Sequence, residues 1–320
     1  MVDLLYKLYS IFCNDSNILE KTKINSVFRY IIRRCANILV PFWYKMTTNN
    51  PHFKINPTLK TEGRIIASLT TFPARIDNIW IVIESILRQS QKPDMLFLWL
   101  SKEQFSSIDV LPNRLKALQN RGLQIQLCDD DLRSHKKYYY VLRDYPHDHL
   151  FTFDDDLIYP TNTISSVMSA STIYPDCIVG RYSNQIELDK TGNVHFTRNR
   201  KRDIAFQPSW TTFIGSGGGT LFPAGFLPEI AKDKNTFMAI CKTADDVWLN
   251  TMCRFSGHKV IAIMNKCPLL EIINKNNSTL TSINVGYENY RQQMTVREFC
   301  IANGKDPFEP LINNKYGIIE

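Results

Sequence analysis

The stretch RIIASLTTFPARIDNIWIVIESIL, residues 64–87, sets the pattern that the following hundred residues repeat. Residues 64–72 form an apolar, β-rich run, and from Ile79 onward apolar residues recur at the i, i+3, i+4 and i+7 positions of a helix capped by Asp77. The same alternation predicts strands at 95–100, 123–128 and 150–153, with helices at 111–119 and 132–145. Crossover connections of this kind produce a mainly parallel sheet flanked by helices. The sequence therefore predicts an α/β, Rossmann-like fold whose ligands gather at the carboxyl ends of the strands.

Beyond residue 160 the alternation weakens into helices at 162–174 and 245–255, strands at 177–181 and 259–264, and a basic loop at 198–202. Four segments follow from these changes of pattern. We expect a basic amphipathic extension and linker at 1–60, a ligand-binding half at 61–160, a second half that grips another substrate at 161–270, and a C-terminal tail at 271–320.

Composition excludes several classes of protein. The chain has 320 residues, 44% of them hydrophobic, and 38 Lys and Arg against 31 Asp and Glu, which suits a folded enzyme-sized protein and not a nucleic-acid binder with a dense basic stripe. Its eight cysteines show no CxxC spacing, so free thiols in a reducing compartment are expected. Without an apolar run of bilayer length or a leader peptide, we expect a cytoplasmic catalytic body.

The first fifty residues are unusual, with seven basic residues against three acidic ones. Residues 26–45 interleave aliphatic, aromatic and Arg side chains and end in Phe42, Trp43 and Tyr44. Such an amphipathic helix can lie in the headgroup layer of an anionic membrane, here as a peripheral contact with its inner face. It can equally dock on the body of the protein.

The decapeptide FTFDDDLIYP, residues 151–160, carries the clearest chemistry. Asp154, Asp155 and Asp156 follow an apolar strand, and three adjacent carboxylates repel one another unless a cation lies between them. In extended backbone Asp154 and Asp156 project to one side and Asp155 to the other. Hard oxygen ligands suit Mg²⁺ or Mn²⁺, so we expect Asp154 and Asp156 to bind one of these ions; the alternative is a solvated acidic turn.

An Asp-x-Asp about ninety residues after the first strand, the text SLTTFPARI at that strand and an Asp-Asp helix start at 245 together resemble a glycosyltransferase of the GT-A fold. The resemblance is to the family-2-like enzymes of bacterial surface-polysaccharide assembly, and it covers residues 64–265. It implies that Asp154 and Asp156 hold a metal on the diphosphate of a nucleotide sugar, for which we favour a UDP-sugar, with Asp155 near the ribose or sugar. The nucleotide cradle then maps onto Thr70, Thr71, Phe72, Pro73 and Arg75.

The residues themselves are consistent with that mapping. The hydroxyls of Thr70 and Thr71 can reach a base or ribose, and Arg75 can donate to a diphosphate oxygen, although a salt bridge to Asp77 is an alternative. Lys136 and Lys137 lie off the core-facing side of their predicted helix, where they either neutralise the donor diphosphate or remain solvated.

Two stretches of the second half are candidates for the acceptor side. Trp210 and the run Gly217, Gly218 and Gly219 suit close approach of a sugar ring, or else form a flexible turn. In KTADDVWL, Thr243 can cap a helix whose first turn carries Asp245 and Asp246. The resemblance assigns the general base to Asp246 and acceptor orientation to Asp245, as in an inverting enzyme.

The function expected from the sequence is a metal-dependent glycosyltransferase that moves a sugar from a nucleotide diphosphate to a glycan or lipid-linked acceptor in surface-polysaccharide synthesis. Two alternatives remain. A haloacid-dehalogenase-type phosphatase also places Asp-x-Asp after an apolar strand, but that strand is generally the first of its chain. A non-catalytic carbohydrate-binding protein could retain the same fold.

Overall fold

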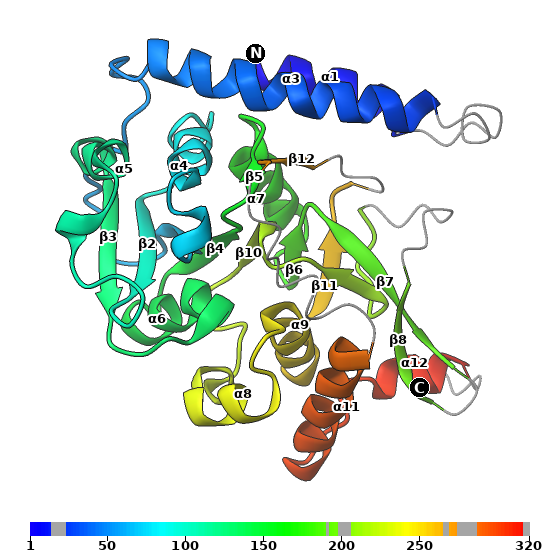
Figure 1. The fold of residues 1–320 in the computed structure, drawn as a ribbon. Coiled ribbons are helices and arrows are strands. Elements are labelled where there is room, and N and C mark those ends of the chain that lie inside the picture. The colour runs from blue at the N-terminus through cyan, green and yellow to red at the C-terminus, as the bar shows by residue number, and fades with distance from the viewer. Residues whose placement is uncertain (14–23, 190–191, 198–205, 265–268, 274–286, 316–320) are drawn as a thin grey trace.

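A computed structural model describes residues 1–13, 24–189, 192–197, 206–264, 269–273 and 287–315, so the basic loop at 198–202 lies outside the described residues. Its centre is a seven-stranded sheet (Figure 1). The strands are β1 (Ile65–Thr70), β2 (Met95–Ser101), β3 (Leu123–Cys128), β4 (His149–Phe153), β6 (Cys177–Gly180), β10 (Gly218–Phe222) and β11 (Lys259–Ala262). Their order is β11-β6-β10-β4-β1-β2-β3.

The sheet is mainly parallel, which confirms the predicted α/β class. β1 pairs in parallel with β2 and β4, β2 with β3, and β6 with β11, whereas β10 is antiparallel to β4 and β6. Alternate side chains of β1 enter different cores: Ala67 and Leu69 join one hydrophobic cluster and Ile66 joins the other. The sheet is therefore buried on both faces, as expected for parallel strands.

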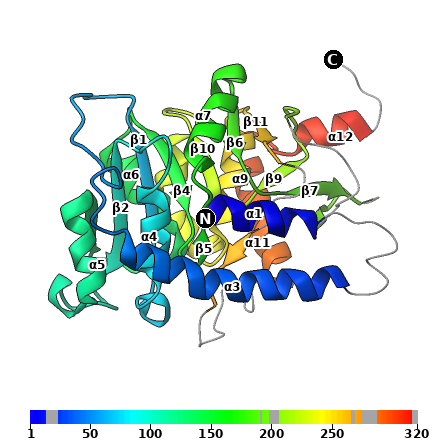
Figure 2. The same cartoon turned by 90° about the horizontal axis from the view of Figure 1, so that it is seen from above.

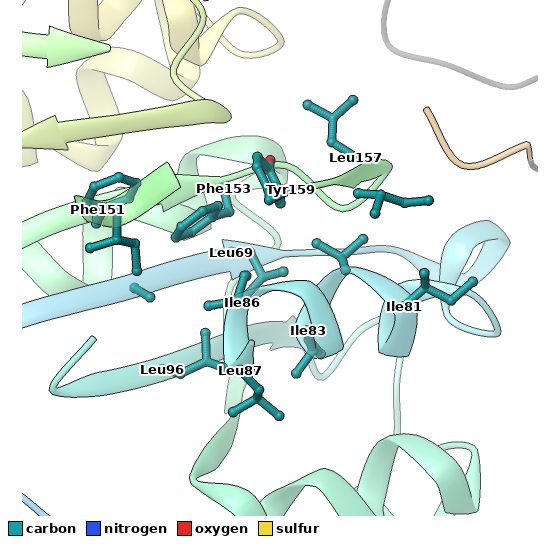
Figure 3. Packing of buried hydrophobic residues seen from close by; sticks show 14 of the residues in the cluster. Leu69, Ile81, Ile83, Ile86, Leu87, Leu96, Phe151, Phe153, Leu157 and Tyr159 are labelled. Atoms are coloured by element: carbon teal, nitrogen blue, oxygen red, sulfur yellow. The ribbon is translucent and has the colours of Figure 1, made fainter. Parts of the chain in front are cut away.

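Helices supply the two covering layers. The core that holds Ala67 and Leu69 includes α4 (Ile79–Leu87), α5 (Asn113–Ala117) and α7 (Thr163–Ile173). In Figure 3, Ile83 and Ile86 of α4 pack close to Leu69 of β1. The other core includes α6 (Lys136–Asp144), α8 (Lys234–Ile240), α9 (Asp245–Phe255), α11 (Tyr287–Ala302) and α12 (Glu309–Lys315). Residues 287–315 thus pack into the body through Val296, Cys300, Phe308 and Leu311.

The N-terminal segment forms a layer of two helices, α1 (Val2–Ile11) and α3 (Ile24–Met46), which lie side by side (Figure 2). Tyr6, Ala36, Val40 and Tyr44 are buried in the body. One side of α3 therefore docks on the body of the protein, as the second of the two alternatives from the sequence predicted. The predicted aromatic tip is wrong in part, because Tyr44 is buried and Trp43 packs against the core, which leaves Phe42 exposed.

Two small sheets complete the fold. β5 (Leu157–Ile158) pairs with β12 (Leu270–Glu271), and β7 (Ser183–Leu188) pairs with β8 (Val194–Thr197) and β9 (Thr212–Ile214). Within the described residues, no helix is both long enough and apolar enough to cross a bilayer. The described cysteines are all free thiols.

Candidate active site

The strand order reverses its direction at one place on the sheet. From β1 the chain moves outward through β2 to β3 and then returns to β4, on the other side of β1. The direction of winding reverses between β1 and β4, and in open α/β sheets ligands bind beyond the carboxyl ends of the strands at such a point. The segments that follow β1 and β4, residues 71–75 and 154–156, contact each other at this point.

The three adjacent carboxylates form a turn. β4 ends at Phe153, Asp155 and Asp156 lie in the turn, and β5 begins at Leu157. The expected alternation of Asp154 and Asp156 against Asp155 is therefore wrong, because it required extended backbone. A residue just after β12 also holds this turn in place, because the Ile272 N–H donates to the Asp156 carbonyl at 2.7 Å.

Arg75 is the cation of this turn. Its guanidinium forms an ion pair with Asp155 and another with Asp156, the latter at 3.0 Å. The Thr71 hydroxyl also donates to Asp155, at 2.6 Å. The alternative of an Arg75–Asp77 salt bridge is thus replaced by one to the acidic turn.

The other residues of the predicted nucleotide cradle, Thr70, Phe72 and Pro73, play different parts in the structure. Phe72 lies under Arg75, whose guanidinium carbon is 5.3 Å from the ring centroid, and Pro73 opens the short helical turn that carries Arg75. Thr70 contributes to the sheet instead, because its hydroxyl donates to the Trp99 carbonyl at 2.8 Å. Of the predicted cradle, Thr71 and Arg75 are therefore the two side chains that contact the carboxylates.

Lys137 connects the two acidic groups of the site. It lies in the first turn of α6, is buried, and places Nζ 2.9 Å from Asp154 Oδ1 and 2.8 Å from Asp245 Oδ2. The Ser68 hydroxyl of β1 donates to the Lys137 carbonyl at 2.5 Å, which fixes this turn against the sheet. Burial opposes the charge on Lys137, but the nearby carboxylates outweigh it and raise the pKa of the ammonium well above its usual value.

Lys136 points elsewhere. It is also buried, and its Nζ lies 2.5 Å from Asp131 Oδ1. The expectation that these lysines are solvated is wrong for both, because each enters the interior with a carboxylate partner.

The glycine run brings a loop against Asp154. The Asp154 N–H donates to the Gly217 carbonyl at 2.9 Å, and a Cβ built on Gly217 would lie 1.7 Å from Asp154 Cγ. Gly218 and Gly219 begin β10, where added Cβ atoms would lie 2.9 Å from Tyr182 Cβ and 2.8 Å from Thr163 Cγ2. The glycines at 218 and 219 thus permit packing of β10, whereas Gly217 permits contact with the acidic turn.

Ser216, which the sequence interpretation did not single out, joins that loop to α9. Its backbone N–H donates to Asp246 Oδ1 at 2.6 Å, and its hydroxyl donates to Asp245 Oδ2 at 2.7 Å. Thr243 does not cap the helix: the residue before α9 is Ala244, and the Thr243 hydroxyl accepts from Gln292 Nε2 at 2.8 Å. The GSGGG run was the one available signal for Ser216, because glycines mark where a backbone approaches another group.

The remaining acceptor candidate, Trp210, has contacts of a different kind. Its carbonyl accepts from Arg254 Nε at 3.1 Å, and Lys259 Nζ lies 6.0 Å from its ring centroid. Both partners belong to the α9–β11 part of the chain. These contacts hold Trp210 beside α9 and β11, and acceptor binding by its ring stays a prediction.

Within the part of the chain that the structure describes, the site holds five carboxylates, of Asp154, Asp155, Asp156, Asp245 and Asp246, and two cations that pair with them, Lys137 and Arg75. Burial and the charge on Asp154 raise the pKa of Asp156 to about 7, and burial and the charge on Asp245 raise the pKa of Asp246 to about 7. Asp245 is also buried, but Lys137 holds its pKa well below the usual range. Among the described residues of the site, carboxyl groups therefore outnumber cations.

The donor set suits a hard divalent cation that also binds phosphate. Within the part of the chain that the structure describes, no three His, Cys, Asp or Glu side chains form a metal site by themselves. Asp154 and Asp156 are partly exposed carboxylates on one turn. Mg²⁺ and Mn²⁺ are commonly held by one or two carboxylates together with phosphate oxygens and water, so these residues fit such an ion when a diphosphate is present.

No protein-family model matches the chain, and no curated protein matches it significantly. Among solved structures, the chain is similar to the mannosyltransferase PcManGT from Pyrobaculum calidifontis in complex with GDP-Man and Mn²⁺. The alignment covers 89% of this chain and 79% of that chain, with a TM-score of 0.49 and 14% sequence identity. At this identity no residue role transfers between the two proteins, so any assignment of function rests on the contacts of the site itself.

Proposed function

We propose that this chain is a metal-dependent glycosyltransferase that transfers a sugar from a nucleotide diphosphate to a glycan or lipid-linked acceptor. The observation that carries the proposal is the joining of two acidic groups by Lys137. One group is the turn at 154–156, and the other is the helix start at 245–246. Both lie where the winding of the sheet reverses, which is the usual place for a nucleotide in an open α/β sheet.

The turn at 154–156 forms the donor side of this proposal. Asp154 and Asp156 would hold Mn²⁺ or Mg²⁺, which when bound neutralises charge on the leaving diphosphate. Thr71 and Arg75 already orient Asp155 and Asp156, and they lie beside the space where the diphosphate would bind. The donor base is not distinguished by these contacts; a UDP-sugar remains our first choice.

Asp246 forms the acceptor side. Its pKa of about 7 suits a general base at neutral pH, because a base is most effective when its pKa lies near the working pH. In the transfer, the acceptor hydroxyl gives its proton to Asp246, its oxygen forms a bond to the anomeric carbon of the sugar, and the bond from that carbon to the diphosphate breaks. Attack from the face opposite the leaving group inverts the anomeric centre.

The role proposed for Asp245 differs from the one implied by the family resemblance. Both Lys137 and the Ser216 hydroxyl contact its Oδ2, and the side chain is buried. A carboxylate in those contacts is poorly placed to orient an acceptor. We assign Asp245 to positioning Lys137 and Ser216, and through Ser216 the carboxylate of Asp246.

A panel of nucleotide sugars tested for Mn²⁺-dependent thermal stabilisation examines the proposal directly, because a ligand that binds the folded state raises the apparent stability. We expect one donor class to raise the melting temperature only when Mn²⁺ or Mg²⁺ is present. Transfer to glycan and lipid-linked acceptors is then assayed with that donor. A nucleotide sugar that binds but is neither transferred nor hydrolysed would favour a carbohydrate-binding protein. Hydrolysis of phosphomonoesters would favour the phosphatase.

A further inference from the structure

The outer side of the N-terminal layer, formed by α1 and α3, is apolar where a water-facing helix is normally polar. Ile38 is 71% exposed and Phe42 is 64% exposed. Other exposed apolar side chains on the two helices are Leu4, Leu8, Ile11, Ile24, Val27, Phe28, Ile31, Leu39 and Met46. A helix that is apolar on both its inner and outer sides is unusual at a protein surface unless something covers it.

The exposed residues of α3 form a continuous stripe. Ile24, Ile31 and Ile38 are seven residues apart, close to two helical turns, and Phe42 lies one turn beyond Ile38. Ala36 and Val40, on the opposite side, are buried in the body. Figure 1 shows α1 and α3 along one edge of the molecule, and Figure 2 shows the two helices from outside that edge.

The charges on α3 have one sign. α3 contains Arg29, Arg33, Arg34 and Lys45 and no acidic residue. Arg34 and Lys45 are exposed and share the side of the helix that carries Ile38, since they lie four and seven residues from it. Asp3, the one carboxylate among the described residues of the two helices, is occupied elsewhere and accepts hydrogen bonds from the Thr161 N–H and hydroxyl at 2.9 and 2.7 Å.

We propose that the outer face of α1 and α3 docks on an anionic lipid bilayer. Apolar side chains enter the boundary between headgroups and acyl chains, and Arg34 and Lys45 reach the acidic headgroups through their flexible stems. A second copy of the chain is a poorer occupant. Across a two-fold contact the basic residues of both α3 helices would face each other, and the described residues of α1 and α3 offer no free carboxylate to pair with them.

The docked layer is tied to the acidic turn by three hydrogen bonds. The Tyr6 hydroxyl of α1 donates to the Ile158 carbonyl of β5 at 2.5 Å, and Arg33 of α3 pairs with Glu271 of β12 at 2.7 Å. The next residue along, Ile272, donates to the Asp156 carbonyl at 2.7 Å. Docking would thus hold the proposed active site beside the bilayer, where a lipid-linked acceptor resides; the docking itself does not depend on the proposed function.

Point substitutions test this better than removal of residues 1–50, because Tyr6, Ala36, Val40 and Tyr44 belong to the core. The full chain is co-sedimented with vesicles of phosphatidylcholine plus phosphatidylglycerol, and with vesicles of phosphatidylcholine alone. Ile38→Ser with Phe42→Ser removes apolar contact, and the matched control is Ile173→Ser with Val110→Ser, at positions 68% and 61% exposed on other elements. Arg34→Gln with Lys45→Gln removes charge, with Arg291→Gln plus Lys305→Gln as its control.

We expect the wild-type chain to bind the anionic vesicles more tightly than the neutral ones, and added salt to weaken that binding. Each test pair should weaken it by on the order of tenfold, whereas the control pairs leave it unchanged. Equal sedimentation of the wild-type chain and both test pairs would overturn the proposal. So would a lipid-free dimer, seen by sedimentation velocity, that Ile38→Ser with Phe42→Ser dissociates, because a second copy would then cover the face.

Discussion

Asp245 and Asp246 are neighbours in the chain, yet their surroundings drive their pKa values in opposite directions. The carboxylate of Asp245 contacts the ammonium of Lys137, which keeps it ionised. The carboxyl of Asp246 accepts its hydrogen bond from the uncharged N–H of Ser216 and lies next to the negative charge of Asp245. Pairs of acidic groups with separated pKa values are typical of sites that move protons.

The substitution Asp246→Asn tests the general-base role. Turnover should fall by ~10²–10⁴-fold while donor binding remains, because the amide keeps the shape but cannot accept the proton. In the wild-type enzyme turnover should rise as the pH passes through about 7, since the ionised form is the base. Rates close to wild type in the variant would remove Asp246 from the mechanism.

The thermal stability of Asp246→Asn also distinguishes the two roles considered for Asp246, a general base and a carboxylate that stabilises the start of α9. A carboxyl with a raised pKa binds its proton more tightly in the folded state, so it stabilises the fold below its unfolded pKa and loses that stabilisation as the pH rises through about 7. Asp246→Asn should therefore unfold at a higher temperature than the wild type above pH 7. A stabilising helix-terminal carboxylate predicts the opposite sign, because Asp246→Asn would then lower the free energy of unfolding by ~1 kcal/mol at most.

Gly217→Ala should impair the acidic turn specifically. The added Cβ would lie 1.7 Å from Asp154 Cγ, so either the turn or the loop at 216–217 must move. We expect loss of metal-dependent donor binding, measured by thermal shift with and without Mn²⁺. Gly63→Ala is the control, because nothing lies within 4 Å of its Cβ and it bears only the strain of a left-handed φ of 65°. Unchanged donor binding in Gly217→Ala would mean that Asp154 does not need its present position.

At the scale of elements, α3 is held to α4 by a buried charge cluster. Glu84 of α4 pairs with Arg88 at 2.9 Å and with Arg121 at 2.5 Å, and the Thr48 hydroxyl, just beyond α3, donates to it at 3.1 Å. The Arg88 guanidinium lies over the Tyr44 ring of α3, 4.4 Å from its centroid. The buried cation Arg88 and the partly buried cation Arg121 both depend on this one carboxylate.

Glu84→Gln should lower the free energy of unfolding by about 3–5 kcal/mol, because it leaves Arg88 and Arg121 buried without their negative partner. Denaturation by urea, monitored by tryptophan fluorescence, measures the change. Glu229→Gln breaks an exposed ion pair with Lys232 and should cost under about 1 kcal/mol. Similar losses in the two variants would show that the buried cluster contributes no more than a surface pair.

Elements with a strong local period could be predicted from the sequence. The strand at 123–128 and the helix at 245–255 match the structure at both ends, and α4 matches in its apolar positions. β7 and β9 could not be predicted, because β7 is largely polar and β9 has only three residues, and both become strands through pairing, β7 with both β8 and β9, and β9 with β7. Their stability comes from tertiary contacts, which a local period does not encode.

In the candidate site, too, local sequence features could be predicted and contacts between distant residues could not. The acidic turn and the helix start were visible as clusters of like charge in the sequence. The partners of Lys137 were not, because Asp154 and Asp245 are remote from it in the chain and meet it only when α6, β4 and α9 assemble. From the sequence, a lysine with no nearby acidic residue in its helix is predicted to be exposed to solvent. Its burial becomes apparent only in the folded protein.

At the scale of the whole molecule, one sheet supports both halves of the proposed site. β1 and β4 present the turn that would bind the donor, and β10, inserted antiparallel between β4 and β6, carries Ser216 and Gly217 to it on its preceding loop. The N-terminal layer then braces β5 and β12 against the same turn. The proposed donor site, the proposed base and the layer proposed to contact a membrane are therefore all linked by contacts to residues 154–158 or their immediate partners.

Calorimetric titration of Mn²⁺ into the protein, with and without UDP or GDP, tests the central claim that this acidic turn binds a metal together with a diphosphate. We predict weak binding of the metal alone and much tighter binding with a nucleoside diphosphate, since the phosphates complete its ligands. Asp156→Ala should abolish the gain, whereas Asp129→Ala, at an 86% exposed carboxylate after β3, should retain it. Metal-dependent nucleotide binding that is unchanged in Asp156→Ala would contradict the account.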